Sequence, residues 1–484
     1  MLNIDKLLLI FSLSLLVFTV AIPPLFEDPD VAWHIAAGEY IVNHQAIPEY
    51  DAWSYIGFEQ RWYNLSWLWD VCCFLLSKYF GFHGLVIITT LMLASLCTFI
   101  YGSTLARKNP ISHDALIIAV TLTSLLFIDT GYLRPQLFSC LMTMIFIKNL
   151  HNFYYHAQSF RPWLLALYTT IWANIHGAFI LIFAIFGTFI ILSIYEKKSR
   201  HITIKLIHNL LLCTFATLIN PLGFKVYIGV LRTLDSVITP YISEWRPFIF
   251  GQSYSFSLLL LVLLLSGSAI NAHYCKAKAH ISDWIFGLMF FIASLSSVRN
   301  FSIFAVVGAP FVASIVDRSL PKPKFPMKLK DSYKRIISTT TILLVVIINT
   351  YLISSDSDKK LGLKKVPVSL IEYVATHYPH SHIMNTYSVG GYIIMFGKNK
   401  FNHFIDGRAG TVFAERNLLE YLETIEGKST LLTLAEKHHV DGIITQKTLL
   451  SKEQESLLSN WQELYEENEY VFLLNKNKLS GNIH

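Results

Sequence analysis

The sequence is poor in charge for its length. Of its 484 residues only 15% are Asp, Glu, Lys or Arg, while 53% are hydrophobic, and its mean hydropathy is +0.46. Soluble domains carry about 25% charged residues, so this composition excludes a soluble multidomain protein. Apolar runs of about 17 to 25 residues, long enough to cross a bilayer, recur from residue 7 to residue 354. We therefore predict a polytopic α-helical membrane protein.

Several common signatures are also missing. No G-x-G-x-x-G stretch occurs, which leaves a dinucleotide site with little support. No small-x-small cleavage site follows the first apolar run, so we interpret that run as an uncleaved membrane span. The cysteines show no spacing typical of metal pairs and are interpreted as thiols on apolar faces. They are Cys72, Cys73, Cys97, Cys140, Cys213 and Cys275.

The net charge of +6 does not indicate nucleic-acid binding, because the basic residues fall in short loops between apolar runs. Basic loops mark the cytoplasmic side of a membrane protein. With the N-terminus inside, the pattern predicts about 11 spans and places the C-terminus outside. The predicted spans cover residues 7–26, 84–105, 114–132, 135–150, 162–175, 177–195, 203–219, 254–272, 282–298, 300–316 and 336–354.

This predicted membrane topology divides the chain into two domains. Residues 1–354 form a transmembrane domain with two long outer loops, 27–83 and 220–253, each predicted to carry an amphipathic helix that lies flat on one leaflet. In the first loop, the aromatic residues of a run at 61–80 suit such an interfacial helix. These residues are Trp62, Tyr63, Trp67 and Trp69.

The long apolar runs end at residue 354, and the pattern of residues 355–484 predicts an extracytoplasmic α/β domain. Short strand-like runs alternate there with helix-like stretches such as 415–425, which favours a mostly parallel sheet covered on both sides. The predicted strands are 382–386, 403–407, 442–446 and 470–475.

Polar residues at the span ends gather on the outer face under this threading. Each has a simple structural interpretation, such as a snorkelling arginine, a helix cap or a helix stop. Ionisable groups at membrane depth cost on the order of 2.5 to 3.5 kcal/mol each, however, so they usually line an aqueous cavity with a function. The set comprises Glu27, Asp28, Asp30, His34, Asp129, Arg134, Asn174, His176, Asn220, Glu244, Arg246, Arg299 and Asn300.

A cavity that combines carboxylates and arginines suits one class of substrate. Arginine forks match phosphate, and carboxylates activate a hydroxyl group or hold a divalent cation. A lipid-linked phosphosugar needs both, because its phosphate meets arginine while its anomeric carbon lies beside an acid. The sequence therefore predicts transfer of a sugar from a polyprenyl-phosphate donor to an acceptor at the extracytoplasmic face.

The stretch from Phe26 to Tyr55 resembles the first outer loop of GT-C superfamily glycosyltransferases, especially oligosaccharyltransferase catalytic subunits. That resemblance implies that Asp28, followed by Pro29, takes the family's acidic position at the metal and acceptor site. His34 stands where the family has arginine, and Asp51 stands where a second acidic element often lies.

The rest of the chain is similar to an uncharacterised bacterial branch of the same superfamily. The similarity rests on "RPQLFS", "WANIHGAF", "INPLGFKVY", "YISEWRP", "SVRNFSIFAVVGAP" and "FIDGRAG" in this order. It implies a multi-pass protein of the bacterial cell inner membrane, with a cytoplasmic N-terminus and a periplasmic C-terminal domain. The acceptor motif W-W-D-Y-G is absent, which argues against transfer to an Asn sequon.

The cofactor is left open between two interpretations. In one, Mg or Mn is held by Asp28 and Asp129. In the other, Asp28 acts as a base without a metal, as the resemblance to other GT-C enzymes implies. The acceptor is equally open between a glycan, a lipid and a protein.

We expect Asp28 to be the catalytic base, with Asp30 as its alternate. Arg134 and Arg299 are expected to neutralise the leaving phosphate. The other predicted substrate-binding residues are His34, Asn174, His176, Glu244 and Arg246. Of these, Glu244 and Arg246 are also expected to form an ion pair at the rim.

Other interpretations remain at this point. Asp406, Gly407 and Arg408 either bind the acceptor or form a turn held by a salt bridge. The whole chain could instead be a transporter or flippase of a lipid-linked or anionic solute, or a membrane scaffold protein. We find no internal repeat of the kind that transporters often show.

Overall fold

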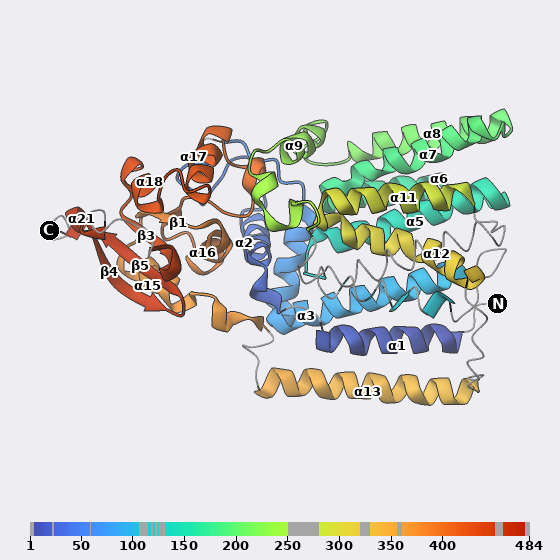
Figure 1. The fold of residues 1–484 in the computed structure, drawn as a ribbon, viewed down its shortest axis with the longest axis horizontal. Coiled ribbons are helices and arrows are strands. Elements are labelled where there is room, and N and C mark those ends of the chain that lie inside the picture. The colour runs from blue at the N-terminus through green and yellow to red at the C-terminus, as the bar shows by residue number, and fades with distance from the viewer. Residues whose placement is uncertain are drawn as a thin grey trace. The chain divides into compact units, whose positions relative to one another are not determined.

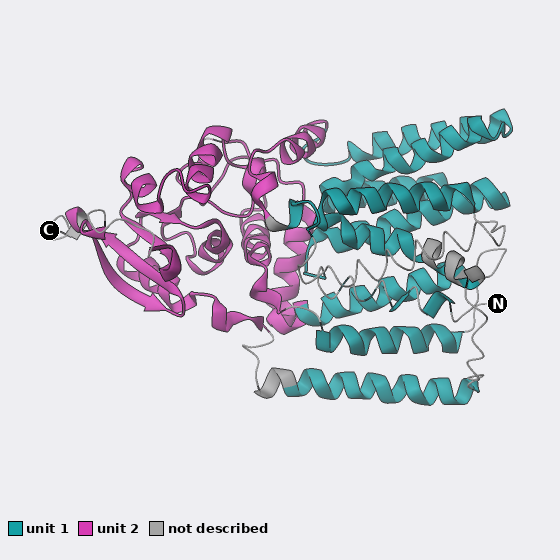
Figure 2. Ribbon diagram, viewed as in Figure 1, with its two compact units in different colours: residues 1–23, 86–223, 243–355 teal, residues 24–85, 224–242, 356–484 magenta. Residues whose placement is uncertain are grey.

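The computed structural model describes residues 4–21, 24–58, 60–105, 131–249, 280–319, 330–355, 361–450 and 458–479, with isolated positions between 115 and 127 (Figure 1). The chain forms two compact units (Figure 2). Unit 1 comprises residues 1–23, 86–223 and 243–355, and unit 2 comprises residues 24–85, 224–242 and 356–484.

Unit 1 is built of long apolar helices. They are α1 (Ile4–Ala21), the second part of α3 (Trp67–Leu105), α5 (Pro135–His156), α6 (Pro162–Ile175), α7 (Leu181–Tyr195), α8 (Arg200–Thr217), α11 (Ile281–Ser296), α12 (Phe301–Ser319) and α13 (Asp331–Ser355). They follow the predicted spans closely, except that α1 ends early and α3 begins at Trp67. The predicted spans 114–132 and 254–272 lie largely or wholly outside the described residues.

The chain is a multi-pass membrane protein. Four of its described helical segments are long and apolar enough to cross a bilayer by length and composition, namely 4–21, 67–104, 177–195 and 331–351. The predicted total of about 11 spans stays a prediction.

Unit 2 contains a five-stranded sheet in the order β2-β1-β3-β5-β4. Its strands are β1 (His382–Asn385), β2 (Asn402–His403), β3 (Gly442–Gln446), β4 (Trp461–Glu467) and β5 (Tyr470–Asn475). Strands β2, β1 and β3 are parallel, as predicted, while β3, β5 and β4 are antiparallel. The sheet is therefore mixed, because β4 and β5 form a hairpin at one edge.

Helices accompany this sheet within unit 2. They are α2 (Pro29–His44), the first part of α3, α9 (Lys225–Leu234), α15 (Val368–His377), α16 (Tyr387–Phe396), α17 (Glu415–Ile425) and α18 (Leu431–Lys437). The loops of the transmembrane domain were expected at 27–83 and 220–253. The segments 24–85 and 224–242, which cover the first loop and part of the second, share a compact unit with the C-terminal residues.

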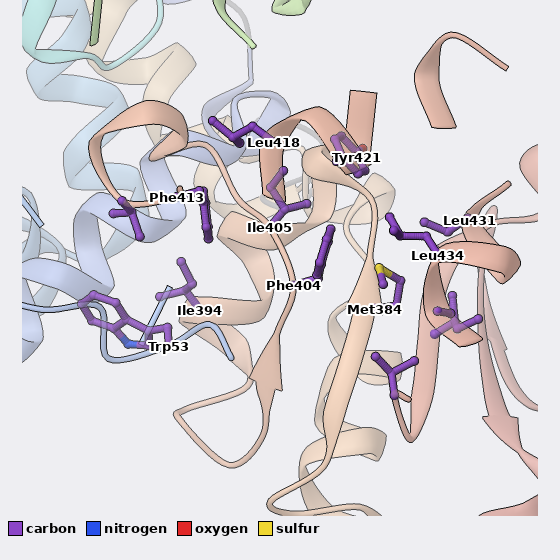
Figure 3. Packing of buried hydrophobic residues seen from close by; sticks show 14 of the residues in the cluster. Trp53, Met384, Ile394, Phe404, Ile405, Phe413, Leu418, Tyr421, Leu431 and Leu434 are labelled. Carbon is purple, nitrogen blue, oxygen red and sulfur yellow. The ribbon is translucent and has the colours of Figure 1, made fainter. Parts of the chain in front are cut away.

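The core of unit 2 joins these segments. Trp33, Trp53 and Trp62 belong to the same buried cluster as Phe404 and Ile405, and Figure 3 shows Trp53 among side chains of the C-terminal segment. The predicted interfacial role of the aromatic run is wrong for three of its members. Trp62, Tyr63 and Trp69 are buried inside the protein, where their rings stabilise unit 2 by packing.

Candidate functional site

Two arginines and one glutamate form the centre of a polar cluster in unit 1. Arg134 lies directly before Pro135, the first residue of α5, and Arg299 lies in the short turn 298–300 between α11 and α12. Arg134 Nη1 donates to Glu244 Oε2, and Arg299 Nη1 donates to Glu244 Oε1 over 2.9 Å. We call Arg134, His176, Glu244 and Arg299 the arginine cluster.

Arg299 is also held by its neighbours. Its Nε donates to Gln136 Oε1 over 2.9 Å, and Gln136 Nε2 donates back to the Arg299 carbonyl oxygen over 2.5 Å. The guanidinium lies over the Trp245 ring, 4.8 Å from its centroid. These contacts fix the direction of a long side chain that would otherwise sample many rotamers.

His176 joins the cluster at the end of α6. Its Nε2 lies 3.3 Å from Arg299 Nη2, and its Nδ1 lies 2.7 Å from Ser139 Oγ. Trp172 Nε1, which can only donate, is bonded to the same Ser139 oxygen over 2.8 Å. All contacts are satisfied if His176 is neutral, accepts from Arg299 at Nε2 and donates from Nδ1 to Ser139.

Asn174 and Arg246 have structural contacts near this cluster. Asn174 Nδ2 donates to the carbonyl oxygens of Thr170 and Ile219, which ties the end of α6 to the chain after α8. Arg246 is exposed, and its carbonyl oxygen accepts from Val298 N. Both Glu244 oxygens are bonded to arginines, Oε2 to Arg134 and Oε1 to Arg299, and the ion pair expected between Glu244 and Arg246 stays a prediction.

The acidic stretch lies in unit 2. Asp28 is the N-cap of α2, with Pro29 in the first turn, and its Oδ1 accepts from Asp30 N over 3.1 Å. Asp28 is only 2% exposed. Asp30 Oδ1 accepts from Trp33 Nε1 over 3.0 Å. The helix-capping interpretation of Asp28 is therefore confirmed, while its catalytic role stays a prediction.

Helix α16 brings further polar groups to the start of α2. A Cβ on Gly391 would overlap the carbonyl oxygen of Pro29, so only glycine allows this approach. Tyr392 Oη donates to the Phe26 carbonyl oxygen over 2.6 Å. Burial raises the pKa of Tyr392, and the nearby Asp28 carboxylate raises it further. Tyr392 therefore stays protonated and donates beside the acidic stretch.

His34 has a partner that the sequence interpretation missed. Its Nδ1 lies 2.5 Å from Asp70 Oδ1, and both residues are buried. Asn64 Nδ2 donates to the other Asp70 oxygen over 2.8 Å, and Ser66 Oγ donates to Oδ1 over 3.3 Å. A lone carboxylate in the aromatic run at 61–80 was the signal that could have revealed this buried pair.

A second buried ionic group surrounds Arg408. Its Nε and Nη2 donate to the two oxygens of Asp406 over 2.9 and 2.7 Å, and its Nη1 donates to Asp51 Oδ1 over 2.7 Å. His403 Nε2 lies 2.7 Å from Asp406 Oδ2. The turn at 406–408 is thus held by a salt bridge, one of the two interpretations that the sequence allowed.

Aromatic packing holds the Arg408 side chain in place, and the neighbouring charges keep Asp406 ionised. The Arg408 guanidinium lies 4.8 Å from the Trp53 ring centroid and 5.0 Å from that of Trp62. Burial alone would raise the pKa of Asp406, but Arg408 and His403 outweigh it and hold that pKa well below its usual range. We therefore interpret the group as a structural clamp of unit 2.

The structure thus brings together some of the predicted site residues. Arg134, His176, Glu244 and Arg299 meet in unit 1, whereas Asp28, Asp30 and His34 belong to unit 2. The shared pocket stays a prediction. Asp129, one of the two expected metal ligands, lies outside the described residues, and among those described no group of three His, Cys, Asp or Glu could hold a metal ion.

Comparisons with known proteins find structural likeness but no sequence relative. No family model and no curated protein matches the sequence. The crystal structure of ArnT from Cupriavidus metallidurans bound to undecaprenyl phosphate is similar over 98% of this chain and 98% of that chain, with a TM-score of 0.48 and 10% identity. ArnT is a GT-C family glycosyltransferase. At this identity and TM-score the likeness assigns neither an activity nor a residue role to this chain.

Proposed function

We propose that the protein is a GT-C-type membrane glycosyltransferase that moves a sugar from a polyprenyl-phosphate donor to an acceptor at the extracytoplasmic face. The observation that carries this proposal is the convergence of Arg134 and Arg299 on Glu244 beside His176. Guanidinium groups held at the end of apolar helices are well placed to take a lipid-borne phosphate, whose polyprenyl chain stays in the bilayer.

The charge of the arginine cluster supports this class of ligand. Two guanidiniums and one carboxylate leave a net charge of +1 when His176 is neutral. A sugar phosphodiester carries one negative charge, which matches this value. The phosphate left after sugar transfer carries more negative charge, so the same arginines would stabilise the charge that develops in the transition state.

The proposed reaction is a displacement at the anomeric carbon. The acceptor oxygen forms a bond to that carbon as the bond to the phosphate oxygen breaks, and the leaving phosphate keeps the bonding electron pair. The Asp28 carboxylate takes the acceptor's proton, with Asp30 as its alternate. Arg134 and Arg299 bind the departing phosphate, and His176 orients its oxygens. The steps need no metal, and a role for Mg or Mn at Asp28 stays a prediction.

The test is to offer the purified protein a panel of polyprenyl-phosphate sugars and to measure released polyprenyl phosphate. Arg299→Gln is expected to lower turnover by about 100-fold or more, as removal of a charged transition-state contact does in other enzymes. Glu244→Gln raises the site charge and is expected to bind polyprenyl phosphate more tightly. Arg416→Gln, on an exposed ion pair of unit 2, is the matched control and should behave as wild type.

The outcomes separate the rival classes. Turnover of a donor that falls with Arg299→Gln supports the enzyme. Transport of a lipid-linked solute across vesicles without release of polyprenyl phosphate would support a transporter or flippase. Absence of both turnover of any donor and transport by the wild-type protein would favour a scaffold.

A further inference from the structure

A buried chain of hydrogen bonds fixes the direction of the His176 ring. His176 Nδ1 lies 2.7 Å from Ser139 Oγ, and the same oxygen accepts from Trp172 Nε1 over 2.8 Å. Ser139 and Trp172 are both fully buried. The backbone is fixed as well, because His176 is the C-cap of α6 and its N–H donates to the Trp172 carbonyl oxygen over 2.9 Å. The ring is thus held through Nδ1, and Nε2 is the nitrogen that meets Arg299.

The Ser139 hydroxyl can hold this ring in more than one protonation state. A serine hydroxyl has one O–H and two lone pairs, and Trp172 takes one lone pair because an indole nitrogen only donates. The second lone pair accepts from Nδ1–H, whether or not Nε2 also carries a proton. Ser139 therefore keeps the ring in place while the charge of the ring changes.

Arg299 determines the state of Nε2 in this structure. Arg299 Nη2 lies 3.3 Å from His176 Nε2, and a guanidinium has only donors. Nε2 must therefore offer a lone pair, which makes the imidazole neutral with its proton on Nδ1. Among the described residues of the arginine cluster, the charged groups that act on this ring are Arg299 directly and Arg134 through the shared Glu244.

A phosphate at the same place would reverse the requirement. An ionised phosphate oxygen only accepts, so a lone pair on Nε2 would face the lone pairs of that oxygen. Because Nε2 and Arg299 Nη2 are 3.3 Å apart, one oxygen can lie within hydrogen-bonding distance of both nitrogens. The favourable arrangement has a proton on each nitrogen.

Charge favours the uptake of a new proton over a simple shift of the Nδ1 proton. With His176 protonated, two guanidiniums, one imidazolium and one carboxylate give the cluster a net charge of +2. A phosphate monoester carries a charge of about −2 above its second ionisation near pH 6. Hydrogen bonds between ionised partners are about twice as strong as neutral ones, and an imidazole changes its charge close to neutral pH.

We propose that binding of a polyprenyl phosphate monoester at the arginine cluster takes up one proton from water at His176 Nε2, and that Ser139 and Trp172 are positioning residues for this step. Only the bond from the Nε2 lone pair to the proton forms. The proposal rests on the proposed function, because the monoester is the product that sugar transfer leaves. It implies that the site distinguishes this product from the singly charged donor by a proton.

The test is to titrate the purified full-length protein in detergent with geranyl phosphate, a short polyprenyl monoester, by calorimetry at about pH 7.5. The titration is repeated in two buffers that differ in their enthalpy of ionisation. The difference in observed heat gives the number of protons taken up, which we expect to be about one for wild type. The singly charged diester geranyl methyl phosphate should take up clearly less. Between about pH 7.5 and pH 8.5, affinity for the monoester should fall by up to about tenfold.

Three variants locate the proton. His176→Gln should still bind geranyl phosphate through the arginines, with proton uptake close to zero. Ser139→Ala should lower the uptake, because Nδ1 loses its acceptor. Thr143→Val is the matched control for Ser139→Ala, since Thr143 is also buried on α5 and its hydroxyl has no hydrogen-bond partner among the described residues. This variant should keep the wild-type uptake.

The outcomes separate this proposal from the proposed function. Binding of geranyl phosphate by wild type without proton uptake overturns the proton-coupled step and leaves the phosphate site intact. Uptake that persists in His176→Gln overturns it too, because the proton then resides elsewhere. Uptake equal in Ser139→Ala and Thr143→Val refutes the positioning role of Ser139. Failure of wild type to bind geranyl phosphate at all contradicts both this proposal and the phosphate site on which the proposed function depends.

Discussion

Arg408 shows how much of unit 2 depends on a single buried side chain. It joins Asp406, its near neighbour, to Asp51, which lies 357 positions away in the chain. Removing one partner from a buried ion pair leaves uncompensated charge and typically costs about 3 to 5 kcal/mol. Lysine could not replace it, because it lacks the planar fork that bonds both carboxylates.

Arg408→Met is therefore expected to lower the stability of unit 2 by about 3 kcal/mol or more. Unfolding can be followed by tryptophan fluorescence, since Trp53 and Trp62 pack on the guanidinium. Arg416→Met, which breaks an exposed pair with Glu420, should change stability by less than about 1 kcal/mol. Equal unfolding midpoints for the two variants would contradict the clamp.

Asp406 gives a pH prediction with a definite sign. Because its pKa is lower in the folded state than the value of about 3.9 for an unfolded chain, its contribution is complete above that value. The contribution is lost as pH falls through the folded pKa. The stability difference between wild type and Asp406→Asn should stay constant from about pH 7 to pH 5 and shrink below about pH 4. A difference that stays unchanged below about pH 4 would show that the folded-state pKa of Asp406 is not lowered.

At the scale of elements, close approach between α2 and the turn after β2 depends on glycine. A Cβ on Gly407 would overlap Asp30 Oδ1 and would also contact Trp33 Nε1. The two side chains are bonded to each other, so neither can move without breaking that bond. This contact holds the N-terminal turn of α2, with Asp28 at its cap, against the C-terminal segment.

Gly407→Ala is expected to destabilise unit 2 by about 1 to 3 kcal/mol through overpacking. Gly187→Ala in α7 is the control, because nothing lies near its added Cβ. Alanine there should be neutral or slightly stabilising. Thermal unfolding of both variants in the same detergent checks the prediction, and an unchanged midpoint for Gly407→Ala would show that the packing is looser than described.

Local sequence patterns predicted many elements correctly. The apolar runs gave most helices of unit 1, and α17 spans residues 415–425, as its pattern indicated. Strand β4 was missed because its run "WQELYEE" mixes charge with few apolar residues, which is common on an exposed edge strand. Strand β2 is two residues long, since the chain turns at Asp406 to form the ionic clamp.

At the scale of the whole molecule, the sequence predicted the class of protein. It did not predict how the chain groups into two compact units. Composition and apolar runs were enough to indicate a membrane protein with an α/β part. The union of residues 24–85 with the C-terminal segment depends on contacts between distant residues, such as Trp53 with Arg408. No local period encodes such contacts. The convergence of Arg134 and Arg299 was anticipated because both lie at helix ends, whereas the role of Glu244 as their shared partner was not.

In the proposed mechanism, the Asp28 carboxylate activates an acceptor for sugar transfer. Asp28→Asn tests it most directly, because asparagine retains the N-cap of α2 and removes only the base. Released polyprenyl phosphate is measured for wild type and for Asp28→Asn across the donor panel, with matched unfolding midpoints as the control. We expect turnover by wild type and a loss of about 100-fold or more in Asp28→Asn. Turnover of Asp28→Asn at the wild-type rate would contradict it.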